Sequence, residues 1–426
     1  MIILNLKVWT SLIVLSFFLP LASPFQPSSP YPIDGYETTG IRRLVQLQRI
    51  VDGTIKGQAP IAGSMLSIND IHLNLTDSER ALHALPELDA AFTKKINAIF
   101  PSLDASYSIA VMDITEGRPV RYAERKGTTG YQPGSVGKLA VALGFFTEIS
   151  RIYPYSFEKR QELMRTRIVK GGKWAMTDSH TVPFYFPETG EFFKRTVREE
   201  DVFSLYEWLD HMMSVSNNGA ASIMWRETML MRAFGDEYPT LTQEAADAFF
   251  KTTPKSELSE LARSVVNDPI RDLGISDEEW KLGILFTRGA GAIVQGKGGS
   301  IGTTRGLMKF LMLMESGHVV DPQSSLEIKR LMYMTDRRIR YAAAPIFTKS
   351  AVYFKSGSLY SCQAEEGFNC VKYQGNKFNY MNSVAIVEHD DGSTYLVVLM
   401  SNVLRKNSAS DHMYLASSVD KAVRSS

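Results

Sequence analysis

The feature that most restricts the fold of this chain is a strand, a turn and a helix that follow one another between residues 107 and 146. Residues 107–114 form a strand-like run, and Leu139–Phe146 is an apolar stretch of helical length. Between them lies Ser135-Val136-Gly137-Lys138, which fits the pattern S-x-x-K. This spacing places the Lys138 amine one helical turn from the Ser135 hydroxyl. A serine hydroxyl needs a nearby base to become a nucleophile. The pair therefore predicts that Ser135 is a nucleophile and that Lys138 is its base.

Two further motifs follow in order. Ser216-Asn217-Asn218 comes after a helix-like run at 205–213, and Lys355-Ser356-Gly357 ends a strand-like stretch at 351–354. S-x-x-K also occurs at Ser156 and Ser418, but neither serine follows a strand and opens an apolar helix. The setting of each motif therefore selects Ser135.

Together the three motifs form the signature of penicillin-binding proteins and serine β-lactamases. Residues 104–150 and 200–404 resemble the catalytic domain of class A β-lactamases. The segment 302–311 is similar to the family helix that precedes the last motif. Residues 381–388 and 394–400 resemble its final two strands, and Asp391-Gly392 supplies the hairpin turn between them.

The resemblance implies an α/β fold in which helices flank an antiparallel sheet, with an inserted all-helical lobe and the active site between the lobes. The expected divisions are a signal peptide (1–23), an N-terminal extension (24–86), an α/β lobe (87–138 and 300–426) and a helical lobe (139–299). Within these, the apolar spacing at 88–100 predicts an amphipathic helix, and the aromatic patch at 181–186 indicates a small hairpin.

The resemblance also implies a role for each motif residue, with Ser135 as the acylated nucleophile and Lys138 as its base or charge partner. Ser216 would carry a proton to the leaving nitrogen. The remaining predicted residues would bind substrate: Asn218 an amide, Lys355 and Ser356 a carboxylate, Gly357 by allowing close approach to the strand, and Ser358 by pairing its N–H with that of Ser135 in the oxyanion hole.

Hydrolysis of the acyl-enzyme is the step on which the sequence and the family differ. Class A β-lactamases use the glutamate of E-x-x-L-N to activate water. The nearest match is Glu279-Trp280-Lys281-Leu282-Gly283, in which glycine replaces asparagine. We therefore take Glu279 as the candidate base, with an acid at a helix start as the alternative. The expected function is a class A-like β-lactamase, and the alternative is a D-alanyl-D-alanine carboxypeptidase or penicillin-binding protein that deacylates slowly.

Composition and the N-terminus suggest an exported protein. Lys7 precedes an apolar run from Val8 to Leu21, and the small residues Ala22-Ser23 follow, which is typical of a signal peptide. We expect a periplasmic or secreted protein, with an uncleaved membrane anchor as the alternative.

The net charge of +1 gives no indication of a nucleic-acid partner, and the short basic run 337–340 is expected to be a solvated face.

Only two cysteines are present, Cys362 and Cys370, just after the third motif. An even pair in an exported chain favours a disulfide, although two free thiols are the alternative. The seven histidines are scattered without an H-E-x-x-H pair, so neither a metal nor another cofactor is expected. The expected partner is a small β-lactam or a peptidoglycan stem peptide, bound by a monomer.

Overall fold

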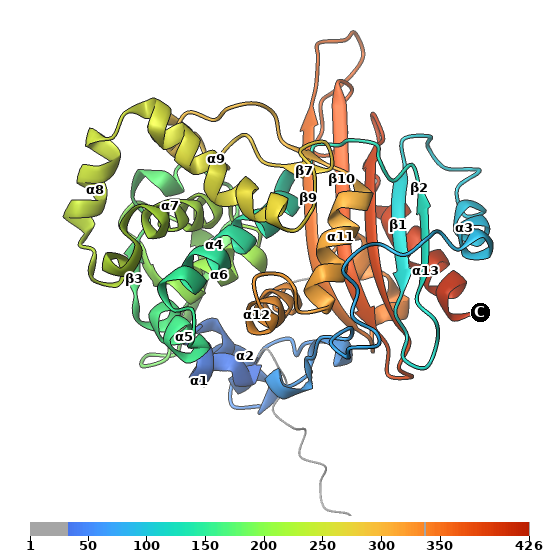
Figure 1. Cartoon of the computed structure of the whole chain (residues 1–426), viewed down its shortest axis with the longest axis horizontal. Helices are drawn as coiled ribbons and strands as arrows, with labels where there is room; N and C mark the ends of the chain where they lie inside the picture. Colours follow the sequence, from blue (N-terminus) through green and yellow to red (C-terminus); the bar gives the residue numbers. More distant parts are fainter. Residues whose placement is uncertain (1–32, 336–337, 426) are drawn as a thin grey trace, which may run out of the picture.

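A five-stranded antiparallel sheet organises the α/β part of the chain (Figure 1). The strand order is β2-β1-β11-β10-β9. The strands are β1 (Ser108–Asp113), β2 (Arg121–Arg125), β9 (Ala351–Ser361), β10 (Phe378–Glu388) and β11 (Thr394–Asn402). This computed structural model describes residues 33–335 and 338–425, so the predicted signal peptide lies outside the described residues. In those two ranges, no helix is long and apolar enough to cross a membrane.

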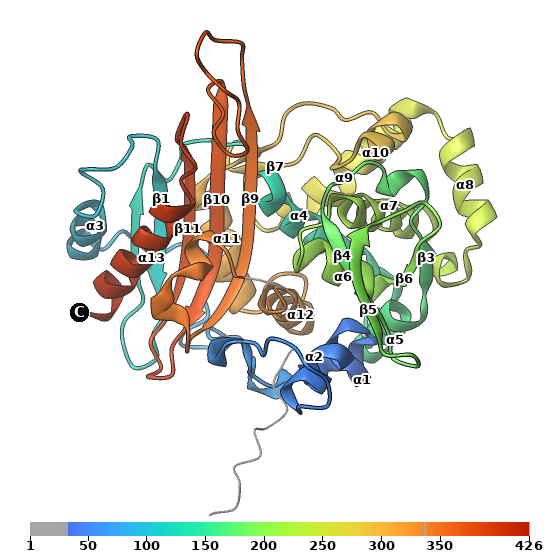
Figure 2. The ribbon, with the colours of Figure 1, turned by 180° about the vertical axis from the view of Figure 1, so that it is seen from behind.

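The sheet is buried on both faces, and β11 shows why its sequence is apolar throughout. Leu396, Val398 and Met400 point to the core that contains α11 (Thr304–Glu315). Tyr395, Val397 and Leu399 point to the opposite core, which α3 (Ala90–Asn97) and α13 (Ala409–Arg424) close. Successive side chains of a strand alternate between faces, so a central strand covered by helices on both sides needs apolar residues at every position. Figure 2 shows α13 lying across its face.

The helical lobe is built around α4 (Lys138–Ile152), which is buried on nearly all sides. Its other helices are α5 (Phe157–Thr166), α6 (Leu205–Met213), α7 (Asn218–Phe234), α8 (Gln243–Thr252), α9 (Lys255–Asp272) and α10 (Arg288–Ile293). The predicted aromatic hairpin is confirmed as β4 (Thr181–Phe186) paired with β5 (Glu191–Thr196). Two short pairings complete the set: β3 (Ile168–Lys170) with β6 (Val202–Ser204), and β7 (Trp280–Lys281) with β8 (Ile301–Gly302).

The N-terminal extension contacts both lobes, and the figures show it beneath them, with α12 (Pro322–Tyr333) above it between the lobes. It begins with α1 (Tyr36–Thr39) and α2 (Arg43–Val51). The Arg43 guanidinium donates two hydrogen bonds of 2.6 Å to Asp210 on α6 of the helical lobe. Farther along, the Asn74 side chain donates to Glu315 on α11 and to Glu388 on β10. A segment whose function could not be inferred from the sequence thus ties the two lobes together.

Two expectations are wrong: the bounds of the helix at 88–100 and the solvent exposure of the basic run at 337–340. The helix expected over residues 88–100 is α3, and it is shorter because Asp89 caps it. Leu88 was expected on the apolar face, but it forms a bridge to Tyr122 and is 48% exposed. In the basic run, the side chains of Arg338 and Arg340 are not a solvated face. They donate to backbone carbonyls of Phe347, Gly63, Ser350 and Gly357, which satisfies their buried guanidinium groups.

Candidate active site

The first motif lies in a tight turn that is anchored to the sheet. Residues Gly134–Gly137 form a 3₁₀ turn, and the α-helix itself begins at Lys138, later than the sequence suggested. Gly134 has a φ of 54°, a conformation that glycine adopts without strain. From β10, the Asn382 amide donates to the carbonyl oxygens of Gln132 (2.9 Å) and Pro133 (3.1 Å). These contacts hold Ser135 against the sheet edge.

Gly357 of the third motif allows this turn to touch β9. A Cβ built on Gly357 would lie 2.1 Å from the Pro133 carbonyl oxygen and 3.0 Å from the Ser135 amide nitrogen. A Cβ built on Gly134 would in turn lie 2.8 Å from the Ser358 amide nitrogen. The sequence interpretation assigned Gly357 to close approach of a ligand. In the structure the close neighbour is the backbone of the turn that carries Ser135. The backbone amides of Ser135 and Ser358 therefore lie along one line of contact between this turn and β9, which we call the seam.

Lys138 stands at the centre of the predicted residues. Its Nζ lies 3.1 Å from Ser135 Oγ, 2.5 Å and 3.2 Å from the carbonyl and hydroxyl oxygens of Ser216, and 2.8 Å from Asn218 Oδ1. An ammonium group has only three protons, so four such contacts cannot all be donated by Nζ at once. A neutral amine, however, can accept the proton of a hydroxyl group. The contact with Ser135 is the one in which this exchange would activate a nucleophile.

The environment of Lys138 favours that neutral form. Its side chain is fully buried, and burial lowers the pKa of Lys138 to about 7 against the opposing effect of the Asp178 carboxylate. Both protonation states are therefore populated near neutral pH. The centre of the apolar Phe286 ring lies 5.3 Å from Nζ.

Ser216 lies between two lysines in the short loop between α6 and α7. Its φ of 61° places it in the left-handed region, which is uncommon for serine and often found at functional sites. Its Oγ accepts from Lys138 and, at 2.8 Å, from Lys355 Nζ. Burial, together with the charges of Lys138 and Arg340, lowers the pKa of Lys355 well below its usual value. The Ser216 hydroxyl therefore bridges the amines of Lys138 and Lys355.

Three residues near these lysines were not found from the sequence. Asp178 accepts from Asn218, Phe286 packs against Lys138, and Arg340 donates at 2.8 Å to the carbonyl of Gly357. None of them belongs to a motif, and each reaches the site from a loop or a short 3₁₀ turn. The basic run at 337–340 was the only available signal, and we had assigned it to the surface.

Glu279 has partners outside this group. Its carboxylate accepts from the Ser276 amide at 3.0 Å and pairs with Lys309 on α11 at 2.7 Å. The part of the same segment that faces the nucleophile turn is apolar, because a Cβ built on Gly137 would lie 2.6 Å from a methyl carbon of Leu282. The Asn267 side chain fixes this loop by hydrogen bonds of 2.9 Å to both backbone groups of Leu282.

The remaining predicted residues lie along β9 and beyond it. Ser356 is partly buried, and its carbonyl oxygen accepts from Lys355 at 3.2 Å. Cys362 and Cys370 form a disulfide in the loop that connects β9 to β10, and Figures 1 and 2 show this loop projecting beyond the sheet. Among the described residues, no three His, Cys, Asp or Glu side chains are grouped in a way that could hold a metal ion.

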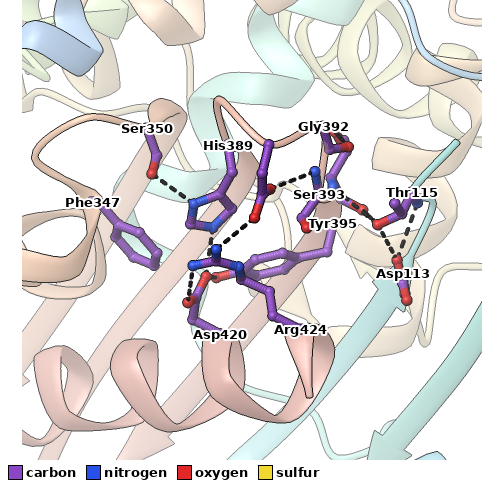
Figure 3. Close-up of polar contacts among 12 residues, drawn as sticks. Asp113, Thr115, Phe347, Ser350, His389, Gly392, Ser393, Tyr395, Asp420 and Arg424 are labelled. Carbon is purple, nitrogen blue, oxygen red and sulfur yellow. Dashed lines mark hydrogen bonds and ion pairs between the residues drawn. The ribbon is translucent and has the colours of Figure 1, made fainter. Parts of the chain in front are cut away.

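Outside this site, a serine, a histidine and an aspartate lie together where the β10–β11 turn meets α13 (Figure 3). Ser350 Oγ is 2.9 Å from His389 Nδ1, and His389 Nε2 is 2.6 Å from Asp420 Oδ1. The composition is that of a hydrolytic triad, but Ser350 is only 2% exposed and Asp420 1%. Because no substrate can reach the serine, this set connects β9, β10 and α13 and is not a second active site.

Comparisons with known proteins identify the family and the fold of the chain. The family described as the beta-lactamase enzyme family matches residues 91–419. A representative class A beta-lactamase from Bacteroides cellulosilyticus is similar in structure, with a TM-score of 0.50 and 16% identity over 78% of this chain and 97% of that one. A variant of PBP-A, solved as an acyl-enzyme complex with penicillin G, has a TM-score of 0.51 and 10% identity over 80% and 100%. No curated protein matches this chain. At these identities the two structures show a shared fold.

Proposed function

Because this chain belongs to the beta-lactamase enzyme family, we propose that it is a serine hydrolase in which β-lactams, or a stem peptide of peptidoglycan, acylate Ser135. We further propose that the acyl group is released slowly. The observation that carries the proposal is the 3.1 Å contact between Ser135 Oγ and the buried Lys138 amine, whose pKa is about 7. A base with a pKa near the working pH is the most effective proton acceptor in such a step.

Acylation would proceed through a tetrahedral intermediate. Lys138 takes the proton of Ser135 as Oγ bonds to the substrate's carbonyl carbon, and the carbonyl oxygen becomes an anion. The amides of Ser135 and Ser358, at the seam that Gly357 permits, hold this anion. When the carbon–nitrogen bond breaks, Ser216 gives its proton to the leaving nitrogen and recovers one from the lysines beside it.

Recognition of an anionic substrate would come from β9. Lys355 and Ser356 hold the carboxylate, and Arg340 adds positive charge from behind the strand. A bound carboxylate stabilises the charged form of Lys355, so ligand binding restores a proton that burial had disfavoured. The Asn218 amide binds the carbonyl of the substrate side chain through its nitrogen.

Slow release of the acyl group is favoured by what surrounds the nucleophile. Hydrolysis needs a base that can activate water, and the ion pair with Lys309 engages the carboxylate of Glu279. Leu282 and Phe286 are the side chains of that segment that approach Gly137 and Lys138. Rapid β-lactam hydrolysis is the second candidate, since Glu279 belongs to the same segment as Leu282, which packs on the turn that carries Ser135.

Two reagents separate these functions. The purified protein would be mixed with a fluorescent penicillin, and the adduct located by peptide mass analysis, while a chromogenic cephalosporin reports turnover. We expect a stable adduct on Ser135, one equivalent of rapid cephalosporin opening, and slow turnover afterwards. Continuous rapid turnover would favour the β-lactamase, and an adduct that survives in the Ser135→Ala variant would refute the nucleophile.

We also propose that the protein is exported, periplasmic or secreted, and monomeric. The disulfide between Cys362 and Cys370 supports export, because such bonds persist in oxidising compartments outside the cytoplasm. Cell fractionation with N-terminal mass analysis tests it. A mature chain that lacks residues 1–23 outside the cytoplasm is expected, whereas a full-length chain in the membrane fraction would indicate the anchored alternative.

A further inference from the structure

The carboxylate of Asp178, which belongs to none of the three motifs, binds Asn218 of the second motif. Asp178 lies in the loop between Ala175 and β4, and only 3% of its side chain is exposed. Its Oδ2 accepts from the Asn218 backbone amide at 2.5 Å, and its Oδ1 accepts from the Asn218 side-chain nitrogen at 3.2 Å. One aspartate therefore holds both the backbone and the amide group of the residue that contacts Lys138.

His180 fixes Asp178 from the other side. Its ring Nδ1 lies 2.7 Å and its backbone amide 3.2 Å from Asp178 Oδ1, and its carbonyl oxygen accepts from Asn217 at 3.0 Å. Although burial opposes it, these hydrogen bonds from His180 and Asn218 hold the pKa of Asp178 below its usual value. Asp178 is thus an anion at neutral pH with almost no contact with solvent.

The orientation of the Asn218 amide follows from this contact. Its Oδ1 accepts from Lys138 at 2.8 Å, while its nitrogen faces the carboxylate. If the amide were rotated by half a turn, its NH₂ group would face the Lys138 amine and its oxygen would face an anion. Both contacts would be repulsive when Lys138 is charged, so a negative charge at Asp178 selects one of the two orientations. The second proton of the nitrogen remains for a substrate carbonyl.

The charge of Asp178 also acts on Lys138, and other charged groups surround the same lysine. The 176–180 loop contributes Asp178 and His180, β9 contributes Lys355, whose charged form burial disfavours, and Arg340 donates to the backbone of β9. The apolar ring of Phe286 lies 5.3 Å from the Lys138 amine. Burial disfavours a charged Lys138, and Asp178 favours it. The balance between these effects decides how much of the base is ready to accept a proton.

We propose that Asp178 is a positioning residue for the acylation step, which orients the Asn218 amide oxygen toward Lys138 and sets the protonation of the base beside Ser135. This rests on the proposed function. A purely structural brace for the start of α7 is a different claim, because the side chain of Asn217 already caps that helix by accepting from Ala220 at 2.7 Å. A brace would affect folding but not the titration of Lys138.

The test compares Asp178→Asn in the full chain with Asp178→Glu, which keeps the charge. Asp201→Asn is the matched control, since Asp201 is a buried carboxylate of the same lobe, bound at 2.6 Å by Arg195 outside the site. The acylation rate with fluorescent penicillin would be measured from pH 5 to 10, with thermal unfolding of each variant. The ¹⁵N resonance of the Lys138 side chain would be titrated in parallel, and it needs no substrate.

In Asp178→Asn we expect the titration midpoint of Lys138, and with it the acid limb of the rate profile, to fall by about one pH unit, because an attractive charge is lost. The plateau rate should also fall about tenfold as the Asn218 amide loses its orientation. Asp178→Glu and Asp201→Asn should keep the midpoint. An unchanged midpoint in a folded Asp178→Asn variant would overturn the proposal. Absence of any penicillin adduct on the unmodified protein would overturn the proposed function instead, while the ¹⁵N titration would still decide the role of Asp178.

Discussion

Replacing Gly357 by alanine should disable acylation more than it unfolds the protein. The added Cβ would lie 2.1 Å from the Pro133 carbonyl oxygen, and 2.8 Å and 3.0 Å from the amide nitrogens of Val136 and Ser135. All three are backbone atoms and cannot rotate away. To restore an ordinary contact of 3.4 Å, β9 and the nucleophile turn must separate by about 1.3 Å.

That separation opens the seam between the amides of Ser135 and Ser358. A misplacement of roughly 1 Å in a reacting group can cost about 100-fold in rate, so we expect the acylation rate to fall by about two orders of magnitude. Overpacking of this kind destabilises a fold by about 1–3 kcal/mol, which a domain of this size can tolerate.

The assay is the rate of fluorescent penicillin labelling, with thermal unfolding measured on the same samples. Gly291→Ala is the matched control, because Gly291 lies in α10 and a Cβ there would meet no atom within 4 Å. The control should label at the normal rate. If Gly357→Ala labelled as fast as the unmodified protein while folded, the inferred seam would not be where the oxyanion is held.

Three other predictions follow from the same geometry. Acylation should rise with pH through about 7 and then level off, because burial lowers the pKa of Lys138 to about 7 and only its neutral form accepts a proton; a flat profile from pH 5 to 9 would contradict this. Glu279→Gln should leave both acylation and turnover of a chromogenic cephalosporin nearly unchanged, whereas accumulation of acyl-enzyme, with turnover slowed by about 10²–10⁴-fold, would identify Glu279 as the base. Replacing Cys362 and Cys370 by serine should change the unfolding temperature little, because the bond closes a short loop at the end of β9, and a large drop would show that this loop supports the core.

The sequence was sufficient for the elements that carry the motifs. The runs at 107–114, 381–388 and 394–400 correspond to β1, β10 and β11, and the family they indicated is confirmed. Edge strand β2 was missed because charged residues such as Arg121 and Glu124 hide its alternation, as is common where a strand faces solvent.

The residues that complete the site could not be found in the same way. The motif residues Ser135, Lys138, Ser216, Asn218 and Lys355 lie together, and their chemical roles stay predictions. Asp178 and Phe286 reach Lys138 only through tertiary packing of loops, and nothing in their local sequence marks them. The same is true of the ion pair between Glu279 and Lys309, which joins residues on different elements.

The position of β11 in the sheet has a consequence for how the chain acquires its structure during synthesis. Ser108 pairs with Met400, so β1 and β2 have only each other as sheet partners until almost the whole chain has left the ribosome. The helices between β2 and β11 in the sequence have local contacts and can form first. Pairing of strands that are so far apart in the sequence comes later, because it has a large entropic cost of loop closure. Lys355 lies on β9, which joins the sheet only through β10. We therefore expect Ser135 to stay unreactive in a nascent chain and to become reactive only when the last strand, β11, is inserted between β1 and β10.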